Sequence, residues 1–368
     1  YIGLELLSIT SYILVGIRRK NRKANESAFK YLVQGGISSA IILYGMSFLY
    51  GISGTTELNG INVSVQGADA SLQPMIYVAF FLLLAGFGFK IAAAPFHTWV
   101  ADTYEGASTP VAAFLAVVSK GAGLGIIFRV FYGVFYPLYS ESGNSQLEGD
   151  VFLSLGVLAA SAMIVGNLLA LRQKNMKRLL AYSGIANAGY LIVPIASQFN
   201  AVHTSNFSEL VYYLVAYLLM TIGAFAVIMV MEKKTGSGLM CAFSGLYYRA
   251  PWTAMAMTLL ILSLAGFPVS AGFFGKLLIL LGAVQVKLYW LAIIMVMTTI
   301  LSYYYYFNII RQMFMRTSEE GEFSKWRTPW TLVLTVWFCA LAGVALGFYP
   351  QVILEWVQTI FSLGMDLF

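Results

Sequence analysis

The sequence predicts an all-α polytopic membrane protein, and three observations carry that prediction. Of the 368 residues, 59% are hydrophobic and only 10% are charged, whereas a soluble domain has about 25% charged residues. The apolar residues lie in stretches of about 20, the length of an α-helix that crosses a bilayer. These stretches are too long for the strands of a membrane β-barrel, and helices satisfy their own backbone hydrogen bonds in lipid.

We expect about ten membrane-crossing helices, followed by a short helix after Pro350. The spans are predicted at residues 1–17, 28–53, 74–104, 110–137, 151–171, 177–199, 208–231, 251–284, 288–312 and 329–348. The third and eighth spans contain internal breaks, which are described below.

The charges of the loops indicate how these helices are oriented. Cations gather in alternate loops, at 18–23, 172–178 and 232–234 with Arg249, and at Arg311, Arg316, Lys325 and Arg327. The intervening loops 54–73, 138–150 and 200–207 contain no lysine or arginine. The positive-inside rule therefore places the basic loops on the cytoplasmic side. We interpret the net charge of +6 as a consequence of this topology, and not as a nucleic-acid surface.

Five charged residues remain inside the predicted spans: Glu5, Lys90, Lys120, Arg129 and Lys276. A charge at the centre of a membrane helix costs about 2.5–3.5 kcal/mol on an insertion scale, so such residues are retained where they pair, face water or carry ions. Lys120 lies about 15 Å into its span and cannot easily reach either surface. Arg129 lies near the outer end of its span, and we interpret it as snorkelling to that surface.

Two of these lysines lie in helices that the sequence predicts to be interrupted. Pro95 cannot donate to the carbonyl of Ile91, which leaves a free acceptor next to Lys90 in the sequence. Around Lys276, Pro268 occurs together with Gly266, Gly272 and Gly275. Broken helices at membrane depth are tolerated where they are buried or line a cavity, and they mark transport sites. Because these are the third and eighth spans, they cross in opposite directions, as inverted repeats of five helices require.

A buried lysine is suited to holding and releasing a proton. Burial favours its neutral form, whereas a nearby carboxylate favours its charged form. If Glu5 approaches Lys90, movement of that carboxylate would switch the lysine between the two. We therefore predict that Glu5, Lys90, Lys120 and Lys276 carry proton translocation.

Other polar residues are weaker candidates, each with a structural alternative. His97 follows the first break and is either a proton relay or a hydrogen-bonded structural histidine. Asp102 and Glu105 are either proton-entry groups or anchors at a helix end. A third group lies on one face of a predicted helix and consists of Ser183, Asn187 and Tyr190. We interpret these residues as forming hydrogen bonds to neighbouring helices, in preference to holding a chain of water molecules.

Several classes of site have no support in the sequence. Cys241 and Cys339 lie far apart without a C-x-x-C motif, which favours neither a metal site nor a disulfide framework. No dinucleotide or phosphate fingerprint follows a strand, so no cofactor is expected in this chain. The N-V-S and N-F-S triplets at Asn62 and Asn206 match the glycosylation signal, and we interpret them as chance matches.

Four stretches of the sequence resemble the antiporter-like membrane subunits of respiratory complex I, the NADH:quinone oxidoreductase. They are GLELLSI (3–9), GFGFKIAAAPFHTWVADTYEGASTPVAAFLAVVSK (86–120), GNLLALRQKNMKRLLAYSGIANAGY (166–190) and LAGFPVSAGFFGKL (264–277). The resemblance covers essentially the whole chain, and the YEGASTPV wording makes the subunit N type the most similar.

The resemblance implies a fold of fourteen helices with two inverted five-helix repeats. The first helices of that fold are absent before Tyr1, and we expect a truncation there. By this resemblance, residues 1–138 are the remainder of the first repeat, 139–315 are the second repeat, and 316–368 are a C-terminal transmembrane helix and short tail. Glu5, Lys90, Lys120 and Lys276 match the family's proton path through the middle of the membrane.

The same resemblance implies a proton-translocating subunit of complex I, driven by quinone reduction elsewhere in the assembly. Quinone, NADH, FMN and Fe–S clusters are then expected in the other subunits. The partners would be the lipid bilayer and other membrane subunits, including neighbouring antiporter-like ones. The expected location is the bacterial plasma membrane, with an organellar inner or thylakoid membrane as the alternative.

Two other functions stay open at this point. One is a subunit of a multi-subunit cation/proton antiporter without redox coupling. The other is a membrane scaffold whose buried charges only hold helices together. The sequence indicates neither the electron donor nor the type of quinone.

Overall fold

The computed structural model describes residues 1–136, 145–197, 206–315, 326 and 328–360, and within them the chain is helical throughout its spans. The first half contains α1 (Ile2–Val15), α2 (Arg22–Ser53), α3 (Leu58–Gln66), α4 (Gln73–Lys90), α5 (Val100–Gly106), α6 (Thr109–Phe114), η1 (Leu115–Ser119), α7 (Lys120–Val130) and η2 (Phe131–Phe135). The second half contains α8 (Ser145–Ala170), α9 (Met176–Ala196), α10 (Asn206–Thr235), η3 (Met240–Phe243), α11 (Leu246–Arg249), α12 (Pro251–Ala265), α13 (Ala271–Gln285), α14 (Tyr289–Met315), α15 (Trp330–Phe348) and α16 (Gln351–Ile360).

These helices confirm an integral membrane protein with the predicted spans. Within the described residues, 8 helices are long and apolar enough to cross a membrane, and α6 to η2 count as one of them. The shorter apolar helices α1, α12 and α13 complete the predicted set, because α12 and α13 together form the broken eighth span. Helix α16 is the short helix that was expected after Pro350.

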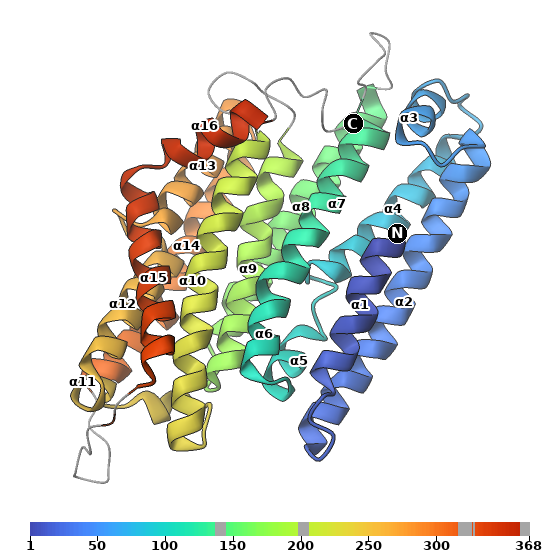
Figure 1. Ribbon diagram of the computed structural model, residues 1–368. Helices are drawn as coiled ribbons and strands as arrows, with labels where there is room; N and C mark the ends of the chain where they lie inside the picture. The colour runs from blue at the N-terminus through green and yellow to red at the C-terminus, as the bar shows by residue number, and fades with distance from the viewer. Residues whose placement is uncertain (137–144, 198–205, 316–325, 327, 361–368) are drawn as a thin grey trace.

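The ends of the helices agree with the predicted orientation (Figure 1). The α1–α2 turn, α5 and α11 lie at the lower end, whereas α3 and α16 lie at the upper end. The basic segments gather below, since Arg18, Lys177 and Lys233 line one cavity there. The predicted loop cations Arg316, Lys325 and Arg327 lie outside the described residues.

Two elements differ from the prediction. Helix α2 begins at Arg22 and not at residue 28, because the Asn21 side chain accepts hydrogen bonds from the amides of Lys23 and Ala24 and caps the helix. Helix α3 lies in a segment predicted as a loop. Its Asn62 side chain donates to the carbonyls of Val134 (3.1 Å) and Tyr136 (2.8 Å), and so covers the end of η2.

Both asparagines of the glycosylation-like triplets are buried. Asn62 is 1% exposed and Asn206 is 4% exposed. The Asn206 side chain donates to the carbonyl of Ser197 at 2.6 Å. Since both amides are occupied inside the fold, the structure supports the interpretation of these triplets as chance matches.

The first break is a full non-helical segment and not a kink at Pro95. Helix α4 ends at Lys90, and helical structure resumes only at Val100. The interruption begins four residues before the proline because Ala92 has a positive φ of 63°, which a right-handed helix cannot contain. The Trp99 indole donates to the carbonyl of Phe89 at 3.2 Å, and this bond holds the segment against the end of α4.

The second break is shorter and contains Pro268 as predicted. Helix α12 ends at Ala265, and Gly266 follows with a φ of 84°. The Ser270 side chain caps α13 by accepting from the amide of Phe273. A Cβ at Gly272 would overlap the carbonyl oxygen of Ser263, so the two half-helices pass too closely for any other residue there.

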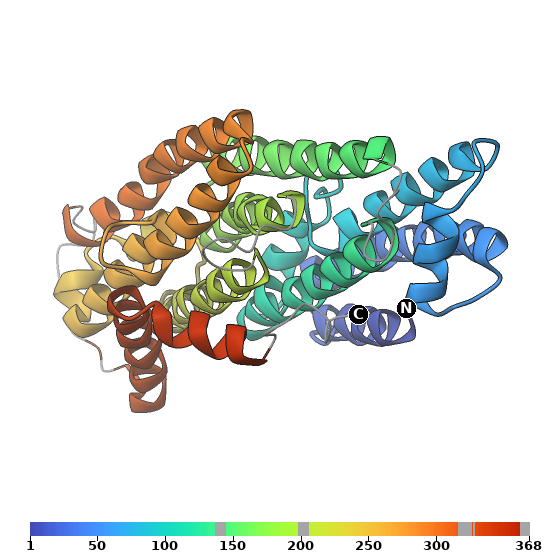
Figure 2. The same cartoon turned by 90° about the horizontal axis from the view of Figure 1, so that it is seen from above.

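The helices form an elongated slab when seen from above (Figure 2). Helices α1 to α4, in blue, lie at one end, α12 to α15, in orange to red, lie at the other, and α9 and α10 lie between them. Helix α9 is buried more completely than the other described spans. This central helix packs against both halves of the chain, since it contacts α5 and α7 on one side and α10, α13 and α14 on the other.

Candidate functional site

Lys90 forms a buried ion pair with Glu5. The Lys90 Nζ lies 3.1 Å from Glu5 Oε1, and the two side chains are 7% and 19% exposed. Glu5 lies on α1 and Lys90 is the last residue of α4. The approach of Glu5 to Lys90, which the sequence left as a condition, is therefore present in the structure.

Two serines that were not predicted complete this pair. The Lys90 Nζ also donates to Ser8 Oγ (2.8 Å) and Ser39 Oγ (3.1 Å). Ser39 Oγ donates in turn to Glu5 Oε1 at 2.6 Å. Ser8 lies three residues after Glu5 and so on the same face of its helix, a spacing that could have identified it. Ser39 comes from α2, and no sequence signal connects it to Glu5.

Lys120 is buried and has no carboxylate partner among the residues that the structure describes. It is 2% exposed, and its Nζ donates to the carbonyl of Gly184 on α9 at 2.5 Å. The Nζ also lies 5.9 Å from the centre of the Tyr217 ring. Lys120 directly follows the π-helical turn η1, an irregularity that is frequent at functional sites.

Gly184 is what allows Lys120 to reach α9. A Cβ at this position would lie 2.8 Å from the Lys120 Nζ and 2.9 Å from the Tyr217 hydroxyl. Both polar atoms therefore occupy the space next to the glycine. The sequence pattern indicated Ser183 as one of three polar residues on a face of this helix, and it did not indicate the neighbouring Gly184.

Lys276 uses the broken helix as its hydrogen-bond acceptor. It lies on α13, and its Nζ donates back to the carbonyls of Leu264 (3.1 Å) and Ala265 (3.2 Å), the last residues of α12. The final carbonyls of a helix have no partner within the helix and carry partial negative charge. The Nζ also lies 4.9 Å from the centre of the Tyr190 ring.

The two break lysines use different hydrogen-bond partners. The sequence predicted that Pro95 leaves the Ile91 carbonyl free, next to Lys90 in the sequence, but the hydrogen bonds found for the Lys90 Nζ go to Glu5 and two serine side chains. Lys90 is the last residue of its half-helix, whereas Lys276 lies inside the second half-helix and its side chain folds back over the break.

The polar face of α9 lies between Lys120 and Lys276. Ser183 is hydrogen bonded to Tyr306 of α14, and the Tyr213 hydroxyl of α10 donates to Asn187 Oδ1 at 2.5 Å. The Tyr190 hydroxyl donates to Thr298 of α14 at 3.2 Å. These three residues make interhelical hydrogen bonds, as interpreted from the sequence, and their partners Tyr306, Tyr213 and Thr298 were not predicted.

His97 and Arg129 have separate surroundings. His97 lies in the first break, and its Nδ1 is buried and makes no hydrogen bond to any described residue. The structure brings no other candidate residue into hydrogen-bond contact with it. Arg129 is exposed, as the snorkelling interpretation requires.

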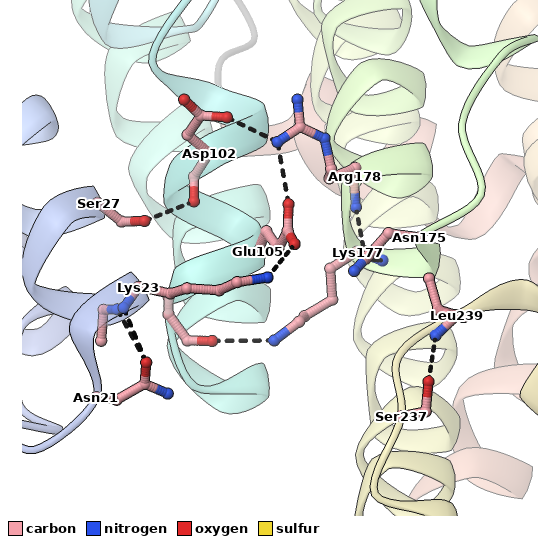
Figure 3. A network of polar contacts seen from close by, with 12 residues as sticks. Asn21, Lys23, Ser27, Asp102, Glu105, Asn175, Lys177, Arg178, Ser237 and Leu239 are labelled. Atoms are coloured by element: carbon pink, nitrogen blue, oxygen red, sulfur yellow. Dashed lines mark hydrogen bonds and ion pairs between the residues drawn. The ribbon is translucent and has the colours of Figure 1, made fainter.

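Asp102 and Glu105 form a charged network at the cytoplasmic end (Figure 3). Arg178 Nη1 lies 2.7 Å from Asp102 Oδ1 and 3.0 Å from Glu105 Oε2. Lys23 pairs with Glu105 at 3.1 Å, and Lys30 pairs with Asp102 at 3.0 Å. The network therefore ties α2, α5 and α9 together.

The protonation of these two carboxyls favours the anchoring interpretation. Burial by itself raises the pKa of Asp102, but hydrogen bonds from Arg178 and Lys30 outweigh it, so the pKa is lowered. The pKa of Glu105 is lowered in the same way, with Lys23 and Arg178 opposing the effect of burial. Both groups are consequently held as carboxylates at neutral pH.

The described residues show little that would fit a metal or a cluster. Within them, no three His, Cys, Asp or Glu side chains gather in a group that could hold a metal ion. Cys241 is exposed and Cys339 is buried, and both are free thiols.

Comparison with known proteins assigns the class of membrane protein. Residues 1–302 match the family model described as NADH:quinone oxidoreductase/Mrp antiporter, TM. The chain belongs to this family of antiporter-like transmembrane proteins.

Within the family, the chain is most specifically similar to subunits of the N type. It is 55% identical over 368 residues to the NADH-quinone oxidoreductase subunit N of Paenibacillus sp. (strain JDR-2), covering 100% of this chain and 70% of that relative. It is 47% identical to the subunit N of Bacillus anthracis, covering 100% of this chain and 72% of that protein.

Solved structures agree with membership of the family. A chain of respiratory complex I from Thermus thermophilus superimposes with a TM-score of 0.77 and 33% identity, covering 96% of this chain and 73% of that one. The Mrp complex from Dietzia sp. DQ12-45-1b superimposes with a TM-score of 0.82 at 22% identity, covering 96% of this chain and 71% of that one. At that identity the second likeness concerns the fold alone.

Proposed function

We propose that this chain is a proton-translocating membrane subunit of a respiratory NADH:quinone oxidoreductase. The observation that carries the proposal is the Glu5–Lys90 ion pair, which is buried at the end of a broken membrane helix. The names of the N-type relatives support the assignment to this complex. Their bacterial sources support a location in the plasma membrane, with other membrane subunits of the complex as partners, neighbouring antiporter-like subunits among them.

The pair acts as a switchable proton-holding site. While Glu5 Oε1 remains 3.1 Å from Lys90 Nζ, the carboxylate stabilises the ammonium form of the lysine. When Glu5 moves away, the ammonium loses its counter-charge in a buried site, and release of the Nζ proton becomes favourable. Ser8 and Ser39 then remain as the hydrogen-bond partners of the amine.

Lys120 and Lys276 continue the path through the second half of the chain. Each is buried and donates to backbone carbonyls, and within the described residues neither forms an ion pair with a carboxylate. A backbone carbonyl stabilises an ammonium less than a carboxylate does, so these lysines are suited to accept a proton transiently and pass it on. His97, in the first break, is proposed as a proton relay.

The redox chemistry is assigned to other subunits. Two separate cysteines, Cys241 and Cys339, do not fit an iron–sulfur cluster, which is held by several cysteine thiolates. We therefore place NADH, FMN, the Fe–S clusters and the quinone elsewhere in the complex, and this chain contributes translocation. We also propose that residues 1–138 are the remainder of the first antiporter-like repeat, that 139–315 are the second repeat, and that 316–368 are the C-terminal part.

A cation/proton antiporter subunit is the second candidate. The family description includes Mrp antiporters, and the fold of an Mrp complex superimposes on the chain. The two functions differ in what drives proton movement. A complex I subunit moves protons only while NADH is oxidised, whereas an antiporter subunit exchanges them for a cation without electron transfer.

The test is a Lys90→Met substitution in the complete complex, reconstituted in vesicles. We expect NADH-driven proton pumping to be lost or strongly reduced, because the proton-holding group is gone. Arg129→Met is the matched control, since it removes an exposed cation from a membrane helix and should leave pumping unchanged. Unchanged pumping in Lys90→Met would refute the role of the pair, and pumping driven by a sodium gradient alone would favour the antiporter.

A further inference from the structure

Three hollows at the cytoplasmic end of the molecule join into one surface. The first is a cavity of about 690 Å³ between the α1–α2 turn, the α5–α6 junction and the end of α10. It shares Ile17, Arg18 and Asn21 with a second hollow on the α1–α2 turn. It shares Thr109, Pro110 and Met229 with a third hollow of about 360 Å³. Both of these volumes fall in the range of ligand pockets.

The first cavity has an excess of positive charge. Its Glu232 forms an ion pair with Lys177 at 3.1 Å and also accepts a hydrogen bond from Thr109. Its Glu105 is neutralised by Lys23 and Arg178, as described above. Arg18 and Lys233 also line the cavity.

Both of these cations are exposed and form no ion pair within the described part of the chain. The adjoining hollow adds further cations from the same turn, namely Arg19, Lys20 and Arg22. The unneutralised charge that faces this surface is therefore positive.

The third hollow is an apolar groove that runs along the membrane-spanning helices. Its walls come from α6 and η1, from α10 and from α15, which lie side by side in Figure 1. The groove is lined by Ala113, Phe114, Val117, Ile222, Phe225 and Leu332, among others. From Thr109 to Val117 the helix rises about 12 Å, so the groove extends from the charged cavity into the depth of the hydrocarbon.

We propose that these joined hollows bind one anionic phospholipid of the cytoplasmic leaflet. Its head-group phosphate would lie in the cavity beside Arg18 and Lys233, and an acyl chain would lie in the groove between α6 and α10. Basic pockets between membrane helices on the cytoplasmic side are suited to anionic head groups. A soluble anion would leave the groove unused, and the ammonium group of a zwitterionic lipid would bring a further positive charge next to the cations of the cavity.

The proposed lipid site is separate from the proton path. Lys90, Lys120 and Lys276 line none of the three hollows. The site does touch the helix that presents Lys120, because Thr109 begins the continuous segment α6–η1–α7. The bound lipid would also bridge the α1–α2 turn and α10, which come from the first and second halves of the chain.

The experiment uses the protein purified from membranes together with the subunits that accompany it. It is reconstituted with phosphatidylglycerol or phosphatidylcholine that carries a photoreactive group in the acyl chain, and labelled peptides are identified by mass spectrometry. We expect peptides of α6–η1 and of α10 that line the groove to be labelled, with phosphatidylglycerol preferred.

Two variants separate the head-group and chain contributions. Each Lys or Arg near an anionic head group contributes roughly a five-fold preference, so Arg18→Gln with Lys233→Gln should lower the phosphatidylglycerol preference by up to about 30-fold. Ala113→Phe should fill the groove and abolish labelling by both lipids. The matched control is Arg172→Gln with Lys174→Gln, which removes two exposed cations on the same side of the membrane and should leave the preference intact.

Two results would overturn the proposal. One is equal labelling of the groove by both lipids in the unmodified protein. The other is an unchanged preference when Arg18 and Lys233 are both replaced. If Ala113→Phe does not fold, the charge variants decide alone, because their side chains are exposed and not required for packing.

Discussion

Gly184 should be essential for the position of the Lys120 ammonium, and Gly184→Ala tests this. The added methyl carbon would lie 2.8 Å from Lys120 Nζ and 2.9 Å from the Tyr217 hydroxyl. These atoms would have to withdraw by about 0.6 Å to restore ordinary contact. The withdrawal would lengthen and weaken the 2.5 Å hydrogen bond from Lys120 Nζ to the Gly184 carbonyl.

The full loss of that bond sets the upper limit of the effect. A hydrogen bond to a charged group contributes about 1.5–3 kcal/mol, which corresponds to roughly a 10- to 150-fold change in how well the site holds its proton. We therefore expect proton pumping by the complex to fall, by up to about 150-fold if the bond is lost entirely. Stability should change little, because alanine is a better helix former than glycine by about 1 kcal/mol.

The assay is NADH-driven acidification of vesicles that contain the reconstituted complex, with Gly121→Ala as the matched control. A Cβ at Gly121 would meet its nearest neighbour, a methyl carbon of Leu214, at an ordinary 3.5 Å. This control introduces the same substitution one residue from Lys120 without touching its Nζ. Equal pumping by Gly184→Ala and Gly121→Ala would show that the Gly184 contact does not position the lysine.

Three further predictions concern stability. The pKa values of Asp102 and Glu105 are lower in the folded protein than in the unfolded chain. Their network therefore stabilises the fold at pH values above the unfolded-state pKa values of about 4. This stabilisation is lost as the pH falls through the lower folded-state pKa values. The difference in melting temperature between the wild type and Asp102→Asn should therefore be present at pH 7 and close below about pH 4; a difference that grows on acidification would contradict this sign. Asn62→Ala should destabilise the fold by about 1–3 kcal/mol in chemical denaturation, because two carbonyls lose a buried partner, and full stability would show that water replaces the amide. Gly272→Ala should cost about 1–3 kcal/mol through overpacking, since its Cβ would overlap the Ser263 carbonyl; an unaltered melting temperature would mean that α12 and α13 can separate freely.

The number, order and direction of the spans could be predicted from the sequence because each depends on local composition. A bilayer requires about 20 apolar residues per helix, and the positive-inside rule acts on individual loops. The cost of a charge in lipid likewise identified Glu5, Lys90, Lys120 and Lys276 one residue at a time. None of these inferences requires knowledge of which helices are neighbours.

The partners of those residues were decided by the tertiary structure. Ser39 reaches Lys90 from α2, and Gly184 reaches Lys120 from α9, over sequence separations that no periodicity links. The first break begins at Ile91 because of local backbone geometry and not because of Pro95. Whether a buried lysine contacts a carboxylate, as Lys90 does, or only helix carbonyls, as Lys276 does, depends on which helix lies beside it. The sequence by itself determined where charge enters the membrane, and helix packing decided what stabilises that charge, because burial is a local property of a span whereas a hydrogen-bond partner is supplied by another helix.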